Sequence, residues 1–202
     1  MRTIGAVTFP KFELLDLYGP LEMFGLLSDD FKINIVGAHR PSEVSAQGPK
    51  TVVDDIFDDN YAYDILLVPG GRGTRTAIND DVFIDWLASS INRSQYVAVV
   101  CTGTSLVART GLLDGHKATT NKAAFQWVAD QGPNVDWQNK ARWVHSGKFF
   151  TSSGVSAGID MSLALIAHIL GLDKAEEAAK WAEYDWHRDP DWDPFAKVHG
   201  LV

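Results

Sequence analysis

Hydrophobic and polar positions along this chain form blocks that predict strands and helices in turn. Four apolar runs rich in β-branched residues predict buried strands, at residues 3–9, 32–36, 65–68 and 96–100. Apolar residues recur at helical spacing over 20–27, 81–92, 105–110 and 122–131. Strands that alternate with helices form a mainly parallel sheet sandwiched by helices, so we expect a doubly wound, flavodoxin-like α/β fold.

The pattern changes in the last third of the chain. Short β-type runs on both sides of Ser146 and Gly147 predict a β-hairpin over 142–153 with a Ser-Gly turn. A strongly apolar helix is expected over 155–170, with Gly171 as its stop, and a helix rich in alanine and charge over 174–184. The aromatic and acidic tail that follows contains two prolines, and we expect it to be irregular but packed.

Composition and charge narrow the class of protein. With 46% hydrophobic and 22% charged residues, the chain suits a single globular domain over 1–202. The net charge of −8 and the lack of a basic block disfavour nucleic-acid binding. The longest apolar stretch is broken by His168 and is too short to span a bilayer, so no membrane association is predicted. A single cysteine excludes an intrachain disulfide, and the absence of an export signal points to the cytoplasm.

That cysteine, Cys101, lies where the predicted strand 96–100 gives way to a helix. A sharp strand-to-helix turn presents its corner side chain at the carboxyl edge of the sheet, beneath the positive end of the helix dipole. A thiol in that position is expected to tend towards thiolate and to act as a nucleophile. The alternative is a buried cysteine that serves as a small apolar side chain.

Three further segments are predicted to meet Cys101 at the same edge, because the carboxyl ends of parallel strands converge there. Asp16 follows the first strand, Gly70 and Gly71 follow the strand over 65–68, and Gly154 precedes the apolar helix. Glu13 is the other acid near the first strand, and burial of Leu14, Leu15 and Leu17 would favour Asp16 as the one that faces the sulfur.

A thiolate, a carboxyl group and backbone amides together suit addition to an electrophilic carbon. Cys101 would attack, the amides of Gly70 or Gly71 and of Thr102 would stabilise developing charge, and Asp16 would move a proton. Simpler interpretations stay open, in which Asp16 caps a helix and the glycines only permit a tight turn. None of the six histidines adjoins Cys101 and no cluster has zinc spacing, so no metal and no cofactor are predicted.

Several of these segments together resemble the ThiJ/PfpI (DJ-1/PfpI) superfamily, whose fold is related to class I glutamine amidotransferases. The resemblance extends from Phe9 through Phe195. The segments that carry it are 15–20, 67–71, 100–103, 111–115 with 118–120, and 156–160.

The Cys-Thr-Gly corner and the aspartate before Leu-Tyr-Gly-Pro are most similar to the isocyanide hydratase branch. This resemblance implies that Cys101 adds to an isocyanide carbon, and that water converts the resulting thioimidate to an N-substituted formamide. It also implies that Asp16 donates the proton and activates water, while Thr102 orders the site. The protease-like branch has a histidine where Thr102 stands, so peptidase activity is disfavoured.

One segment departs from the hydratase pattern. Such sequences usually read Ala-Thr-Thr-His-Trp, whereas Asn121 and Lys122 follow Ala-Thr-Thr here. We expect Asn121 and Val155 to line the pocket, together with Gly154, so the small-molecule substrate can differ from that of other hydratases.

The resemblance also implies a homodimer. Two alternative functions remain open on the sequence alone. One is a glyoxalase-like or deglycase-like activity on 2-oxoaldehydes. The other is a non-enzymatic oxidative-stress sensor or chaperone that uses oxidation of Cys101.

Overall fold

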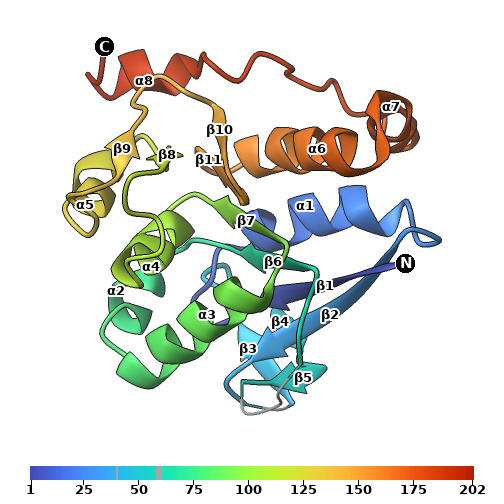
Figure 1. Ribbon diagram of the computed structural model, residues 1–202, viewed down its shortest axis with the longest axis horizontal. Coiled ribbons are helices and arrows are strands. Elements are labelled where there is room, and N and C mark those ends of the chain that lie inside the picture. The colour runs from blue at the N-terminus through green and yellow to red at the C-terminus, as the bar shows by residue number, and fades with distance from the viewer. Residues whose placement is uncertain (40, 58–60) are drawn as a thin grey trace.

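The computed structural model describes residues 1–39, 41–57 and 61–202. A seven-stranded sheet forms its centre (Figure 1). Its strands are β1 (Arg2–Val7), β2 (Phe31–Gly37), β5 (Asp55–Ile56), β6 (Ile65–Val68), β7 (Tyr96–Val100), β10 (Trp143–Ser146) and β11 (Phe149–Ser152). Their order across the sheet is β10-β11-β7-β6-β1-β2-β5, and only β10 runs antiparallel to its neighbour.

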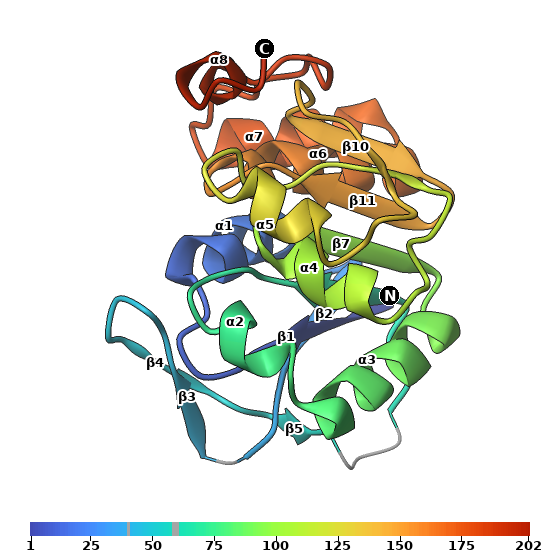
Figure 2. The same ribbon diagram turned by 90° about the vertical axis from the view of Figure 1, so that its left-hand side faces the viewer.

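Helices cover both faces of this sheet (Figures 1 and 2). One face carries α1 (Leu14–Gly25) and α6 (Ala157–Leu170), with α7 (Leu172–Trp181) packed against α6. The other carries α2 (Thr74–Ala77), α3 (Asp81–Arg93) and α4 (Gly103–Arg109), with α5 (Phe125–Ala129) against α4. The doubly wound α/β architecture predicted from the sequence is confirmed.

Smaller elements complete the fold. Strands β3 (Ser42–Val44) and β4 (Lys50–Val52) form an antiparallel pair, and β8 (Lys117–Ala118) and β9 (Asp136–Trp137) form a parallel one. The C-terminal tail contains one short helix, α8 (Pro194–Val198), which lies at the edge of the molecule beyond β10 (Figure 1). Within residues 1–39, 41–57 and 61–202, no helix has the length and apolar character needed to cross a membrane.

Strands β6 and β7 have the bounds that the sequence predicted, 65–68 and 96–100. Every residue of β6 is fully buried, and so are Val97 to Val100 of β7. A central parallel strand is covered on both faces, so its sequence is an uninterrupted apolar run that is easy to recognise. These two strands fix the edge at which the candidate site is built.

Four expectations about elements are corrected. The helix predicted over 20–27 is α1, which begins at Leu14, and Pro20 lies inside it. The helix predicted over 122–131 is shortened to Phe125–Ala129, because the Asn121 side chain accepts the Ala124 N–H and forms a turn before it. Ser146 pairs with Phe149, so the hairpin loop consists of the two residues after Ser146, not of a Ser-Gly pair. The tail is irregular only in part, since it contains α8.

Candidate active site

Cys101 forms a sharp corner between β7 and α4. Its backbone has a φ of 58°, in the left-handed region that side chains other than glycine rarely adopt. The hydroxyls of Thr104 and Thr120 donate to its carbonyl oxygen at 3.0 and 2.7 Å, and its own N–H donates to the carbonyl of Ser152 at 3.2 Å. These bonds hold the corner in a strained conformation of the kind found at nucleophilic residues on strand-to-helix turns.

Asp16 lies in the first turn of α1 and is fully buried. Its Oδ2 accepts the N–H of Gly70 at 2.9 Å, so the side chain bridges to another loop and does not cap its own helix. Its Oδ1 has no hydrogen-bond partner among the described residues, and the carboxyl group lies beside the Cys101 thiol. A buried carboxyl oxygen without such a partner is available to a thiol or a substrate proton.

The other candidate acid, Glu13, does not face the sulfur. Its carboxylate accepts from the Gln47 side chain, in an exposed contact. Leu17 is fully buried, as expected if Asp16 turns inward, whereas Leu15 is 43% exposed. The leucines therefore divide between the core and the surface, and Asp16 is the acid beside Cys101.

The amides of Gly70 and Gly71 do not have the role that the sequence suggested. The Gly70 N–H donates to Asp16, and the Gly71 N–H donates to Oγ1 of Thr102 at 3.0 Å. Both amides thus position side chains of the site and are not free to stabilise charge on a substrate. Gly70 has no room for a side chain, because a Cβ atom there would lie 2.6 Å from the Thr102 nitrogen and 2.9 Å from Oδ2 of Asp16.

The protonation state of the pair also differs from the expectation of a thiolate. Burial raises the pKa of the Cys101 thiol well above its usual value, and the charge of Asp16 raises it further. The N–H and hydroxyl of Thr102 lower that pKa by smaller amounts. Burial likewise raises the pKa of Asp16, although the Gly70 N–H opposes this. Cys101 is only 5% exposed, and desolvation is the largest cause of the raised pKa of its thiol, so the pair retains a transferable proton at neutral pH.

A cavity of about 330 Å³ has Gly154 in its lining, and Gly154 packs against the sulfur of Cys101. A Cβ atom on Gly154 would lie 2.8 Å from Sγ of Cys101 and would overlap Nδ2 of Asn121. Asn121 and Val155 are both in the lining, where the sequence placed them. The side chain of Asn121 therefore supplies an amide donor close to the sulfur.

Some residues of the site have no role in the sequence prediction. Thr120, which holds the Cys101 carbonyl, belongs to a recognised motif segment, so its position carried a signal. Phe195 and His199 line the cavity from the C-terminal tail, and no local pattern marks them. Among the described residues, no three His, Cys, Asp or Glu side chains are grouped so that they could hold a metal ion.

Lys122 also lines the cavity and is 3% exposed. Its Nζ donates to Oγ1 of Thr119 at 2.7 Å and to the carbonyl of Ala141 at 2.6 Å. Burial lowers the pKa of Lys122 to about 8, and the charge of Asp193 partly offsets this. The ammonium group is thus held in place by Thr119 and Ala141.

Comparisons with known proteins agree with the geometry. A model of the DJ-1/PfpI family matches residues 2–168. Isonitrile hydratase of Pseudomonas putida is 32% identical over 181 residues, which cover 90% of this chain and 78% of that protein. The crystal structure of a ThiJ/PfpI family protein from Pseudomonas syringae matches with a TM-score of 0.85 and 30% identity, over 99% of this chain and 84% of that one. Drosophila melanogaster DJ-1beta shares the fold at 17% identity, with a TM-score of 0.80 over 92% of this chain and 99% of that one.

Proposed function

Because the chain belongs to the DJ-1/PfpI family, we propose that it is an enzyme that hydrates a small isocyanide to an N-substituted formamide. The observation that carries the proposal is the buried Asp16 carboxyl beside Cys101, whose Oδ1 has no hydrogen-bond partner among the described residues, with a cavity lined by Gly154 next to the sulfur. The similarity to an isonitrile hydratase supports this reaction. The mechanism requires only the two side chains and water, with no cofactor or metal.

In the first step, the sulfur of Cys101 bonds to the terminal carbon of the isocyanide. The thiol proton passes to Asp16, and the same carboxyl delivers a proton to that carbon, which gives a thioimidate, R–N=CH–S–Cys101. Burial raises the pKa of Asp16, so its carboxyl can carry this proton near neutral pH. The strained corner and the N–H of Thr102 hold the sulfur in place beside Gly154.

In the second step, water adds to the thioimidate carbon. Asp16 accepts a proton from the water and a proton reaches the substrate nitrogen, which gives R–NH–CH(OH)–S–Cys101. The C–S bond then breaks, the hydroxyl proton returns to the sulfur through Asp16, and the formamide leaves. We assign to Nδ2 of Asn121 a hydrogen bond to the substrate nitrogen, since this amide lies beside Gly154 near the sulfur.

The burial of Cys101 favours this reaction over a role as an oxidative-stress sensor. Peroxide oxidises the thiolate, and sensor cysteines have a lowered pKa and are accessible to solvent. Here burial raises the pKa of the thiol, and the side chain is 5% exposed. By analogy with its relatives, we also propose that the protein acts as a homodimer, which light scattering would measure directly.

The test is to incubate the purified protein with cyclohexyl isocyanide and detect the formamide by mass spectrometry. We expect Cys101→Ala and Asp16→Asn to lower the rate by at least about 100-fold. Asp81→Asn is the matched control. Asp81 lies in the first turn of α3, just as Asp16 lies in the first turn of α1, but Asp81 is exposed whereas Asp16 is buried. Turnover that survives in Cys101→Ala, or a lack of formamide from both alkyl and aryl isocyanides, would overturn the proposal. Consumption of methylglyoxal in place of isocyanide would favour the glyoxalase-like alternative.

A further inference from the structure

The C-terminal tail supplies one wall of the cavity next to Gly154, the residue that packs against Cys101. Phe195 and His199, from α8 and the residue after it, line this cavity together with Leu15 and Gly154. The model of the DJ-1/PfpI family ends at residue 168, so this wall comes from a part of the chain outside the matched segment.

Hydrogen bonds fix α8 at both ends. Asp193 is fully buried, and its Oδ1 accepts the N–H of Phe195 at 2.9 Å as the N-cap of the helix. The N–H of Asp193 donates to the carbonyl of Lys140 at 2.7 Å. After the helix, Nδ2 of Asn139 donates to the carbonyl of Leu201 at 2.6 Å. Both ends are thus tied to the same short segment, so Phe195 is presented by a fixed element.

Charge also ties α8 to the cavity. Oδ2 of Asp193 is buried without a hydrogen-bond partner among the described residues, and the charge of Asp193 raises the pKa of Lys122 against the effect of burial. Lys122 lines the cavity, while Asp193 begins α8. The attraction between them holds the helix towards the cavity.

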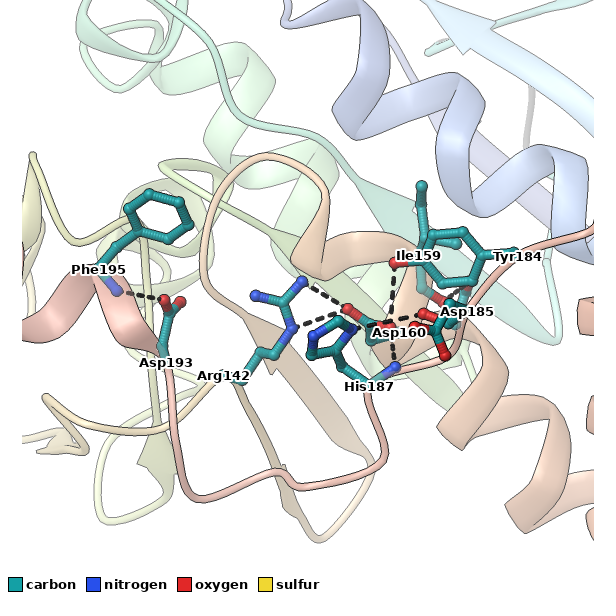
Figure 3. Close-up of polar contacts among 9 residues, drawn as sticks. Arg142, Ile159, Asp160, Tyr184, Asp185, His187, Asp193 and Phe195 are labelled. Atoms are coloured by element: carbon teal, nitrogen blue, oxygen red, sulfur yellow. Dashed lines mark hydrogen bonds and ion pairs between the residues drawn. The ribbon is translucent and has the colours of Figure 1, made fainter.

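A second cluster anchors the tail upstream of α8 (Figure 3). Asp160 of α6 accepts from the Arg142 side chain at 2.6 and 2.8 Å, from the Tyr184 hydroxyl at 3.1 Å and from the N–H of His187 at 2.9 Å. Figure 3 shows these groups around one carboxylate, with Asp193 and Phe195 further along the same tail. The tail is therefore anchored before, at and after α8.

Two residues of the lining, Phe195 and Leu15, have large apolar side chains that are half-exposed. Phe195 is 50% exposed and Leu15 is 43% exposed, although both lie in the lining of the cavity. An apolar group of a ligand that covered these side chains would remove their surface from water, which is favourable. The reactive end of such a ligand would then lie at Cys101.

We propose that Phe195, together with Leu15, forms the subsite for an apolar substituent of the substrate, and that Phe195 sets the largest substituent that reaches Cys101. This inference rests on the proposed function and names its substrate class, a compact isocyanide with an apolar alkyl or single-ring group. Asp193 is a positioning residue that acts through Phe195.

The first experiment measures access to the sulfur and does not require turnover. Cys101 is the only cysteine in the sequence, so mass spectrometry of the intact protein reports its alkylation directly. Rates are compared for iodoacetamide, which is small, and N-phenylmaleimide, which is bulky. We expect Phe195→Ala to raise the ratio of the bulky to the small rate by about tenfold, and Phe195→Trp to lower it. The control is Val198→Ala, on the same helix, 71% exposed and outside the lining, which should leave the ratio unchanged.

The second experiment compares kcat/KM for methyl and cyclohexyl isocyanide in the same variants. Phe195→Ala should change the cyclohexyl-to-methyl ratio by about tenfold, and Val198→Ala should not change it. An alkylation ratio in Phe195→Ala equal to that of the wild type would overturn the inference. If the wild type hydrates neither isocyanide while the alkylation ratio still responds to residue 195, the proposed reaction is wrong, but the inference that Phe195 limits access to Cys101 is supported.

Discussion

Asp160→Asn should destabilise the protein far more than its conservative chemistry suggests. Asp160 is fully buried, and Arg142, its ion-pair partner, is 7% exposed. Burial raises the pKa of Asp160 more than Arg142 lowers it, so the desolvation of this carboxylate outweighs the attraction of its partner. The intact pair therefore adds little net stability, but the loss of one member leaves the other buried without compensation.

The magnitude follows from the contacts. Asparagine keeps the volume of the side chain and an oxygen that can accept from the Tyr184 hydroxyl and the His187 N–H. The variant loses the negative charge opposite Arg142 and two charge-assisted hydrogen bonds, at 2.6 and 2.8 Å. Removal of one partner from a buried pair costs about 3–5 kcal/mol, which is a large part of the stability of a typical domain. In the double variant Arg142→Met with Asp160→Asn no charge is left unpaired, so we expect a free energy of unfolding within about 2 kcal/mol of the wild type.

Urea unfolding followed by tryptophan fluorescence measures the free energy of unfolding of the single variant and of the double variant. The control pair is Lys174 and Glu177, whose ion pair at 3.0 Å is exposed on α7, and its neutralisation should leave the free energy of unfolding nearly unchanged. The reasoning is refuted if Asp160→Asn loses less than about 1 kcal/mol. It is equally refuted if the double variant loses the sum of the two single losses, since the two residues would then be uncoupled.

Two predictions concern protonation. Burial raises the pKa of Cys101, so its alkylation rate should increase with pH mainly above the range of a free cysteine, and Asp16→Asn should shift that increase to lower pH because the neighbouring charge is lost. The alkylation rate is measured from pH 6 to 10 by quenching samples at timed intervals. An increase in the wild-type rate that is centred below about pH 8 would contradict the prediction. The pKa of Lys122 is lowered from 10.5 to about 8, so between these values the unfolded chain binds more protons than the folded protein, and the contribution of Lys122 to the free energy of unfolding increases with pH. Across this window, we expect the free energy of unfolding of the wild type to rise by about 2–3 kcal/mol relative to that of Lys122→Met. Urea unfolding at each pH measures both values, and the same pH dependence in the two proteins would disprove the prediction.

The sequence was informative where structure depends on local pattern and on parallel topology. The apolar runs of β6 and β7 have no polar interruption, so both strands were predicted with their observed bounds. Parallel strands end at one edge of the sheet, and this alone brings Asp16, Cys101 and Gly154 together from distant parts of the chain. The start of α1 was missed because Pro20 is typical of a first helical turn, whereas here it lies in the seventh position of the helix.

The features that sequence did not predict depend on contacts between distant segments. The thiolate expectation considered the helix dipole but not the desolvation of Cys101, which results from segments that lie far from it in the sequence. The amides of Gly70 and Gly71 are occupied by Asp16 and Thr102, and only the folded structure reveals such pairing. Phe195 reaches the cavity because α8 is anchored by remote bonds, which leave no local signature. The homodimer and the cytoplasmic location stay predictions.

The cavity is assembled from the beginning, the middle and the end of the polypeptide, since Leu15, Gly154 and Phe195 all line it. A ribosome releases the N-terminal part of a chain first, and that part begins to fold before the rest has emerged. The cysteine corner and its carboxyl neighbour are therefore synthesised well before α8 exists to cover them. The segment that supplies Phe195 is thus made after those that supply Leu15 and Gly154, so the wall that we propose sets the size limit is the last of the three to be added.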